Sequence, residues 1–219
     1  MIVAWETELT QNLVTPLGVL AYYGARAALE AIEELIHDET NTLGLHIGLG
    51  ASKVQGHHVG GILGRWEYYI NGDACHQMNA AEGDAQIGQV VISSECHGHI
   101  HTCPDIQGLE VQSVLLQSGR YVLQSIEAET VMDLPKFVCP KLNKEMIARI
   151  SSYIPGSVTS TVKAGQLTKD DASIRTLSVL FIGLHGILNI LDPTEQLDKI
   201  QATFTSVQEA AYHVYGKSM

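Results

Sequence analysis

The chain has 219 residues, of which 45% are hydrophobic and 17% are charged, a balance that excludes a mostly disordered protein. Its 24 acidic residues outnumber 13 basic ones, so the net charge of −11 favours neither nucleic acid nor anionic membranes as partners. No apolar run approaches the roughly 20 residues of a membrane span, and four cysteines are too few for a disulfide framework. We therefore expect a cytoplasmic protein with no membrane span and no nucleic-acid partner.

The first half of the chain alternates helical and strand patterns. An apolar run at Met1–Trp5 predicts a strand, and helical spacing of apolar residues predicts a helix over Leu17–His37 with its glutamates in solvent. Period-two patterns and turn residues then predict a series of strands around one short helix at Asp73–Glu82. The strands are expected at Leu43–Leu49, Val54–Ile62, Trp66–Ile70, Gln89–Ser93, Leu109–Leu116 and Tyr121–Ile126.

The second half begins with a proline-punctuated stretch that contains a predicted helix at about Asn143–Tyr153. A β-rich run at Arg175–Leu184 predicts a further strand. Pro193–Tyr215 predicts a helix, because its apolar residues recur every three or four positions and Gly216 stands where a helix end is expected. Core burial is the simplest use of this apolar stripe, and a partner-binding face is the alternative.

Several segments together resemble class III nucleotidyl cyclases, and most closely the tandem-domain, bicarbonate-responsive soluble adenylyl cyclases. Leu45-His-Ile-Gly-Leu-Gly-Ala, the hairpin beginning His58-Val-Gly-Gly-Ile-Leu-Gly-Arg-Trp, and Gly88-Gln-Val-Val-Ile-Ser follow the order of that family's motifs. Ile150-Ser-Ser-Tyr-Ile-Pro and Ile174-Arg-Thr-Leu-Ser-Val-Leu-Phe are similar to the junction into a second cyclase domain. The resemblance implies an α/β (α+β) fold, an incomplete ferredoxin-like cyclase domain followed by the opening strand and helix of another.

The implied domain boundaries are residues 1–134 for the C-terminal part of a first domain, 135–173 for a linker, and 174–219 for the start of a second domain. As an alternative, the strand at 175–184 and the helix at 193–215 complete the first domain by docking onto it, as in a circular permutation. That arrangement predicts that Val179 lies close to Leu45–Leu49.

The resemblance also implies a reaction, the conversion of ATP to cyclic AMP and pyrophosphate with two Mg²⁺ ions on two aspartates. Both aspartates are expected upstream of Met1, and Gly183 stands at a metal-aspartate position of the second domain. His76 and Ala80 occupy the positions of the transition-state asparagine and arginine, and Asn79 occupies that of a bicarbonate-sensing arginine. We therefore expect no intact catalytic residue and no cofactor bound by this chain. Whether ATP or GTP is preferred stays open.

A histidine-rich segment offers a different chemistry. On an extended backbone, His97, His99 and His101 would project to one side, and with Cys96 and Cys103 they could hold zinc. A polar loop is the alternative, since no C-x-x-C unit is present. Two other chemistries are excluded, because the glycines near Lys53 form no P-loop and Ser93 and Ser94 lack a nucleophile elbow.

Two functions remain from the sequence. In one, the chain is a fragment or truncated form of a soluble-type adenylyl cyclase that is inactive alone. In the other, it is a non-catalytic interaction module that pairs with a second cyclase domain or an intact cyclase.

Overall fold

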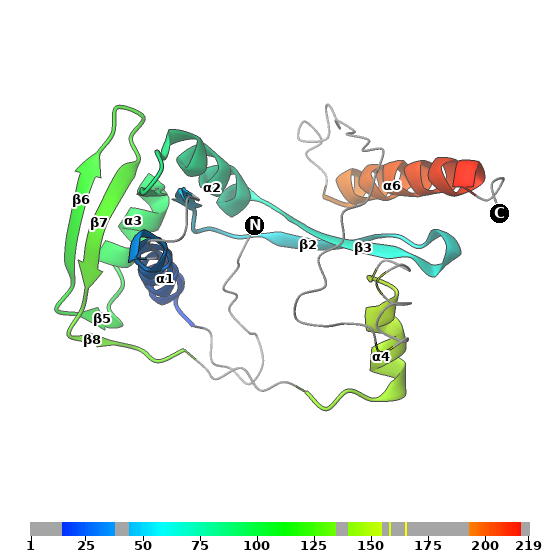
Figure 1. Ribbon diagram of the computed structural model, residues 1–219, viewed down its shortest axis with the longest axis horizontal. Coiled ribbons are helices and arrows are strands. Elements are labelled where there is room, and N and C mark those ends of the chain that lie inside the picture. The colour runs from blue at the N-terminus through cyan, green and yellow to red at the C-terminus, as the bar shows by residue number, and fades with distance from the viewer. Residues whose placement is uncertain are drawn as a thin grey trace. The chain divides into compact units, whose positions relative to one another are not determined.

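The computed structural model describes residues 15–37, 44–134, 140–154, 158, 165 and 193–215. The chain divides into two compact units, Met1–Gln55 with Ile70–Val138, and Gly56–Tyr69 with Cys139–Met219 (Figure 1). The strands predicted at Met1–Trp5 and Arg175–Leu184, together with Gly183 and Val179, lie outside the described residues. The mixed α/β class is confirmed, whereas the predicted domain boundaries and the second-domain assignment stay predictions.

The first unit is built on a four-stranded sheet in the order β1-β4-β7-β6. β1 pairs parallel to β4, and the other two pairings are antiparallel. β6 and β7 form the predicted hairpin, with a register shift between Gln112 and Ser113. A small sheet, β5 with β8, was not predicted. The strands are β1 (Ile47–Leu49), β4 (Val90–Ile92), β5 (Ile106–Gln107), β6 (Glu110–Leu115), β7 (Tyr121–Glu127) and β8 (Thr130–Val131).

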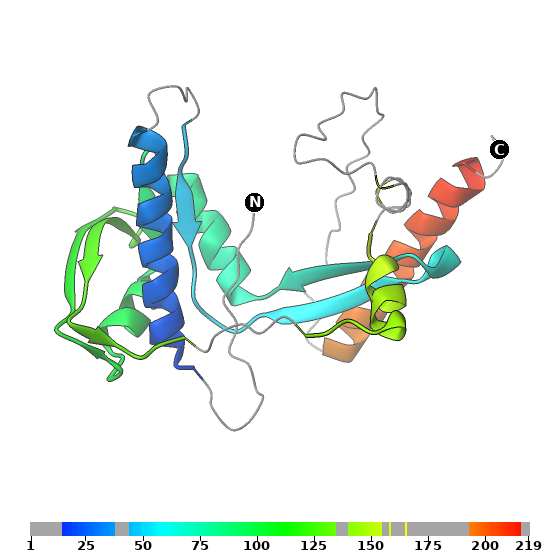
Figure 2. The ribbon, with the colours of Figure 1, turned by 60° about the horizontal axis from the view of Figure 1, so that its bottom comes forward.

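Helices α1 (Leu17–His37) and α2 (Asp73–Asp84) cover opposite faces of β1. Ile47 and Leu49 join the core that α1 residues form over β4 and β7. Gly48, between them on the other side of the strand, faces the backbone of α2. Figure 2 shows β1 running between the two helices. The helix predicted over Leu17–His37 is confirmed, and its glutamates at 30, 33 and 34 are exposed.

A third helix of this unit, α3 (Ser94–His101), corrects one sequence interpretation. The histidine-rich segment is helical and neither extended nor a loop. Ser93 caps the helix, because its Oγ accepts a hydrogen bond from Cys96 N at 3.0 Å. Cys96 and Ile100, one helical turn apart, are buried in the core with α1. Burial of this apolar pair against α1 outweighs the period-two arrangement of the histidines.

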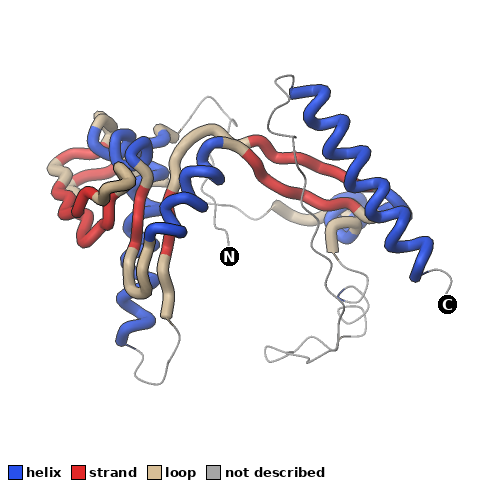
Figure 3. The backbone as a smooth tube through the Cα atoms, turned by 90° about the horizontal axis from the view of Figure 1, so that it is seen from above, coloured by secondary structure: helices blue, strands red, loops and turns tan. Residues whose placement is uncertain are grey.

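The second unit contains residues 56–69 of the hairpin formed by β2 (Gln55–Gly60) and β3 (Trp66–Asn71), with α4 (Lys144–Ser151) and α6 (Pro193–Tyr215). A 3₁₀ turn, η2 (Ile62–Gly64), joins the two strands. Figure 3 shows the hairpin strands lying alongside α6. All four elements match predicted ones. Among the described helices of the chain, none combines the length and apolar character that a bilayer span needs.

Two glutamines join α6 to the hairpin through the backbone. Gln201 accepts from Gly60 N at 2.9 Å and donates to Gly60 O at 2.8 Å. One heptad later, Gln208 accepts from Ile62 N at 3.2 Å and donates to Arg65 O at 3.1 Å. Each side-chain amide thereby pairs with backbone N–H and C=O groups at the end of the hairpin, as a neighbouring strand would. Ile200 of the predicted apolar stripe is buried, but Leu197 and Val214 are exposed, so the stripe is only partly covered.

Candidate functional site

Helix α2 carries the three site residues predicted by resemblance, and it is held tightly in place. A Cβ at Gly48 would lie 2.3 Å from Glu82 N and 2.4 Å from Met78 O, so only glycine permits this approach of β1 to α2. Gln77 Oε1 accepts hydrogen bonds from Ala51 N at 3.0 Å and from Ser93 Oγ at 2.9 Å. The glutamine therefore links α2 to the chain after β1 and to the residue after β4.

His76, Asn79 and Ala80 lie at spacings of three and four residues, which places them together on one face of α2. The His76 and Asn79 side chains are exposed, and Ala80 is half-buried. The same helix carries only acidic formal charges, Asp73, Glu82 and Asp84. This face can donate hydrogen bonds through an imidazole and an amide, but it presents no fixed positive charge to a triphosphate.

The two Mg²⁺ ions implied by the resemblance do not fit these residues. Magnesium prefers carboxylate, phosphate and water oxygens in octahedral geometry, and neither His76 nor Ala80 supplies a carboxylate. Among the residues that the structure describes, no group of three or more His, Cys, Asp or Glu side chains is arranged to hold a metal ion. Gly183 lies outside them. We therefore derive no reaction step through magnesium.

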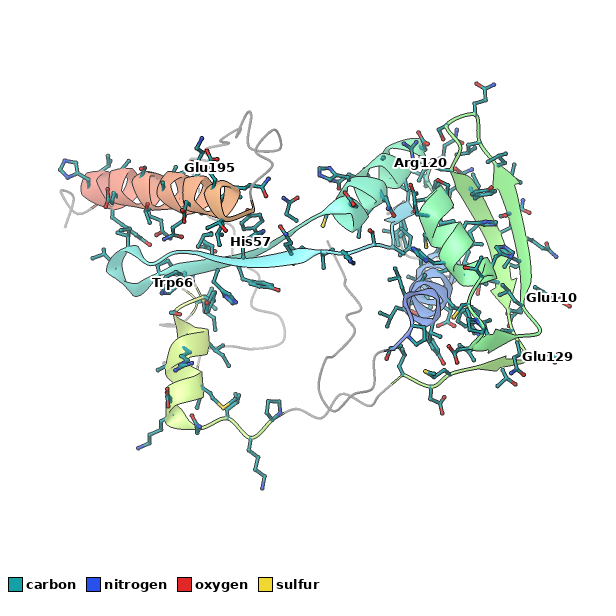
Figure 4. The ribbon with its side chains drawn as sticks, turned by 180° about the vertical axis from the view of Figure 1, so that it is seen from behind. His57, Trp66, Glu110, Arg120, Glu129 and Glu195 are labelled. Carbon is teal, nitrogen blue, oxygen red and sulfur yellow. The ribbon has the colours of Figure 1, made fainter. Side chains whose placement is uncertain are left out.

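The C-terminal end of α2 is anchored electrostatically. Asp84 Oδ2 accepts hydrogen bonds from Ser118 Oγ and from the Arg120 guanidinium, both in the segment that joins β6 to β7 (Figure 4 labels Arg120). These two donors hold the pKa of Asp84 below its ordinary value. On the same helix, Glu82 Oε1 lies 2.8 Å from His46 Nε2. Both acidic groups are therefore used in structural pairs.

Helix α3 separates the proposed zinc ligands. Cys96 is fully buried in the core, and burial raises the pKa of its thiol to about 12, so it is not available as a thiolate. Cys103 packs against the core, where a Cβ at Gly18 of α1 would meet its side chain. His99 is exposed, and the structure brings only His97 and His101 together. Their Nε2 atoms lie 3.1 Å apart.

His97 is also fixed from its other side. Its ring stacks on Tyr121 of β7, with centroids 3.9 Å apart and planes inclined by 7°. Burial, and then the neighbouring His101, lowers the pKa of His97, so this imidazole is neutral at pH 7. The sequence signal for the pair was the i, i+4 spacing on a helix, which the alternation of the histidines concealed.

The hairpin of the second unit carries an aromatic stack with a buried histidine. His57 stacks on Tyr69 at 4.9 Å, and Tyr69 stacks on Phe204 of α6 at 5.9 Å. His57 is 8% exposed, and its Nε2 has no hydrogen-bond partner among the residues that the structure describes. Burial raises the pKa of Tyr69. Tyr69 of the hairpin therefore packs inside this unit, between His57 and Phe204.

The neighbouring histidine is used differently. His58 Nδ1 lies 2.7 Å from the Tyr153 hydroxyl, and its ring contacts Tyr68 at 4.9 Å. Trp66 N donates to Ser152 O at 3.0 Å, so the end of α4 is joined to β3 (Figure 4 labels His57 and Trp66). Of these two successive histidines, His57 stacks on the tyrosine that contacts α6, and His58 contacts the residue that follows α4 closely in the chain.

Comparison with known proteins gives a fold likeness of limited extent. No protein-family model matches the chain, and no curated protein matches it. Among solved structures, a guanylyl cyclase domain of the RhoGC fusion protein from Blastocladiella emersonii matches with a TM-score of 0.40 and 17% identity, over 53% of this chain and 62% of that chain. The guanylate cyclase domain of RhGC from Catenaria anguillulae, solved with GTP, matches with a TM-score of 0.39 and 16% identity, over 56% and 65%. This chain spans less than two thirds of either domain.

Proposed function

We propose that this chain is a class III nucleotidyl cyclase-type protein, similar to the soluble adenylyl cyclases, whose own residues do not complete a catalytic centre. The order of elements supports this: β1, the hairpin β2–β3, α2, β4 and Ser93 follow one another as the family motifs do. By this resemblance the 219 residues correspond to the stretch from the middle of one cyclase domain to the start of the next, and ATP is the family substrate.

The face of α2 carries the proposal that the chain is inactive alone. Charge that develops on the phosphate in the transition state needs preorganised donors or cations. Ala80 has no polar side-chain atom, and Asn79 is neutral. Removal of one such donor costs about 10²–10³ in rate in other enzymes, so an alanine at the arginine position is expected to lower any rate by at least this factor.

An assay of the pure chain tests this directly. The protein is incubated with ATP or GTP and either Mg²⁺ or Mn²⁺, and cyclic nucleotide is measured by mass spectrometry. We expect none above the protein-free control. Metal-dependent cyclic AMP that disappears when His76 is replaced by alanine would contradict the proposal, because it would show that this helical face acts in catalysis.

An exposed leucine at the hairpin tip favours the second function, pairing with another cyclase domain. Leu63 in η2 is 83% exposed and has φ 52° and ψ 28°, a left-handed conformation that is costly for a residue with a branched side chain. The left-handed backbone at Leu63 is the observation that motivates a contact at this tip, since such conformations often occur at binding sites. In this function the chain binds an intact cyclase and alters its activity.

Leu63→Asn provides a clean test of pairing. Asparagine accepts the left-handed conformation better than leucine, so the chain keeps or slightly gains stability while the apolar tip is lost. Crosslinking and co-purification with an intact class III cyclase are expected for the natural chain and reduced for the variant. Equal capture of both proteins would rule out the tip as the contact, and capture of neither would rule out pairing.

A reducing, cytoplasmic location is proposed on the state of the cysteines. Cys75, Cys96 and Cys103 are free thiols in the described part of the chain. Burial raises the pKa of Cys75, so this thiol also stays protonated. Free thiols are the usual state in the cytosol.

A further inference from the structure

The pair of facing imidazoles on α3 is the feature that the proposed function leaves unused. His97 Nε2 and His101 Nε2 lie 3.1 Å apart, one helical turn from each other. The ring centroids are 4.2 Å apart, and the ring planes are inclined by 43°. Between neutral imidazoles this contact holds a single proton, because one Nε2 must donate and the other must accept.

The spacing of the two nitrogens suits a metal ion equally well. Imidazole nitrogen binds zinc at about 2.0–2.1 Å, and a chord of 3.1 Å between two such ligands subtends about 95–102° at the ion. This value falls between the 90° of square-planar or octahedral coordination and the 109° of a tetrahedron. The distance between the two nitrogens is therefore compatible with both binding one ion, once the ring that donates in the present contact changes its tautomer and the rings, now inclined by 43°, adjust their tilt.

Two features around His97 and His101 favour binding of a metal ion. Tyr121 stacks on His97 with nearly parallel planes, so this ring is already ordered before any ion arrives and less conformational entropy is lost on binding. His101 is exposed, which leaves the ion a path from solvent and room for water in its remaining coordination positions.

We propose that His97 and His101 form a bidentate site for a divalent transition-metal ion of the imidazole-binding class, Ni²⁺, Cu²⁺ or Zn²⁺. The site differs from the cluster that the sequence suggested, since buried Cys96 and the core-packed Cys103 take no part. It lies on α3 and is independent of the α2 face, so it stands or falls separately from the proposed function.

Calorimetric titration of the full, tag-free chain with NiCl₂ tests the site, and ZnCl₂ is used in a second series. The natural chain is expected to bind one Ni²⁺ saturably. His97→Gln and His101→Gln are each expected to weaken binding about tenfold or more, because one ligand cannot chelate. His99→Gln on the same helix and Cys103→Ser at its end are the matched controls and are expected to bind as the natural chain does.

Side-chain nitrogen spectra provide the second readout. On addition of paramagnetic Ni²⁺ we expect the Nε2 resonances of residues 97 and 101 to broaden first. Because His101 is exposed, its replacement leaves the fold intact, and circular dichroism verifies this for both variants. Absence of saturable binding, unchanged affinity in His101→Gln, or an equal loss in Cys103→Ser would each overturn the proposal.

Discussion

The contact between β1 and α2 predicts that Gly48→Ala strongly destabilises the first unit. The added Cβ would lie 2.3 Å from Glu82 N and 2.4 Å from Met78 O. Ordinary contact begins near 3.4 Å, so α2 must move by about 1 Å, and both opposing atoms are backbone atoms that no side-chain rotation can remove. Overpacking of this kind costs about 1–3 kcal/mol.

The same displacement pulls Gln77 away from its two partners. Its hydrogen bonds to Ala51 N and Ser93 Oγ are 3.0 and 2.9 Å long, and a further 1 Å breaks both. Two lost hydrogen bonds add about 1–3 kcal/mol, so the total for Gly48→Ala is about 2–6 kcal/mol of unfolding free energy.

Gly83→Ala on the same helix is the matched control. A Cβ there meets nothing within 4 Å, and alanine is better than glycine in a helix by about 1 kcal/mol, so this variant is expected to be more stable. Urea unfolding followed by far-UV circular dichroism gives the free energies, and hydrogen exchange of peptides spanning residues 44–92 locates the change. If Gly48→Ala unfolds within 0.5 kcal/mol of the natural chain, the close approach is not as described.

Three further outcomes follow from individual contacts. The pKa of Asp84 is lower in the folded chain than the ordinary aspartate value of about 4, so this carboxylate stabilises the fold fully above that value and loses its contribution as the pH falls through the lowered pKa. Asp84→Asn should therefore flatten the acid dependence of stability. Arg120→Gln should raise the titration midpoint of Asp84 in NMR spectra. His57→Phe keeps the ring stack and removes a buried nitrogen that has no partner in the described part of the chain, so thermal unfolding should show a gain of about 1–3 kcal/mol. A loss of stability would mean that Nε2 has a partner. Gln201→Ala and Gln208→Ala should each weaken the attachment of α6 by about 1–3 kcal/mol and speed hydrogen exchange in residues 193–215. Gln196 is not a suitable control position, because this residue also interacts with other residues of the chain.

Periodicity predicted the elements whose pattern is long or paired. The 23 residues of α6 and the β6–β7 hairpin were found because their apolar residues repeat at one period over their whole length. Helix α3 was missed because His97, His99 and His101 suggested a period of two. The cap at Ser93 and the turn-spaced pair Cys96 and Ile100 were the signals that could have found it.

The arrangement of the site residues was less accessible. Ala51, Gln77 and Ser93 meet only because β1, α2 and β4 pack together, and nothing in their local sequence marks a glutamine as the link. The same holds for Gln201 and Gln208, which stand beside the apolar stripe of α6 and bind a hairpin more than 130 residues away in the chain. Such contacts between distant segments are set by tertiary structure and leave no local period.

One side of α2 packs against the rest of the first unit, and the other side is exposed. On one side, backbone atoms of Met78 and Glu82 lie against Gly48 of β1, and the Gln77 side chain accepts a hydrogen bond from the chain after β1. The side chains of His76 and Asn79 are exposed and make no hydrogen bond to other described residues, although His76 N donates to Gly72 O in the first turn of the helix. Substitutions on this exposed face are therefore compatible with the fold. Because His76 is exposed, the packing of the first unit would also permit an asparagine at this position.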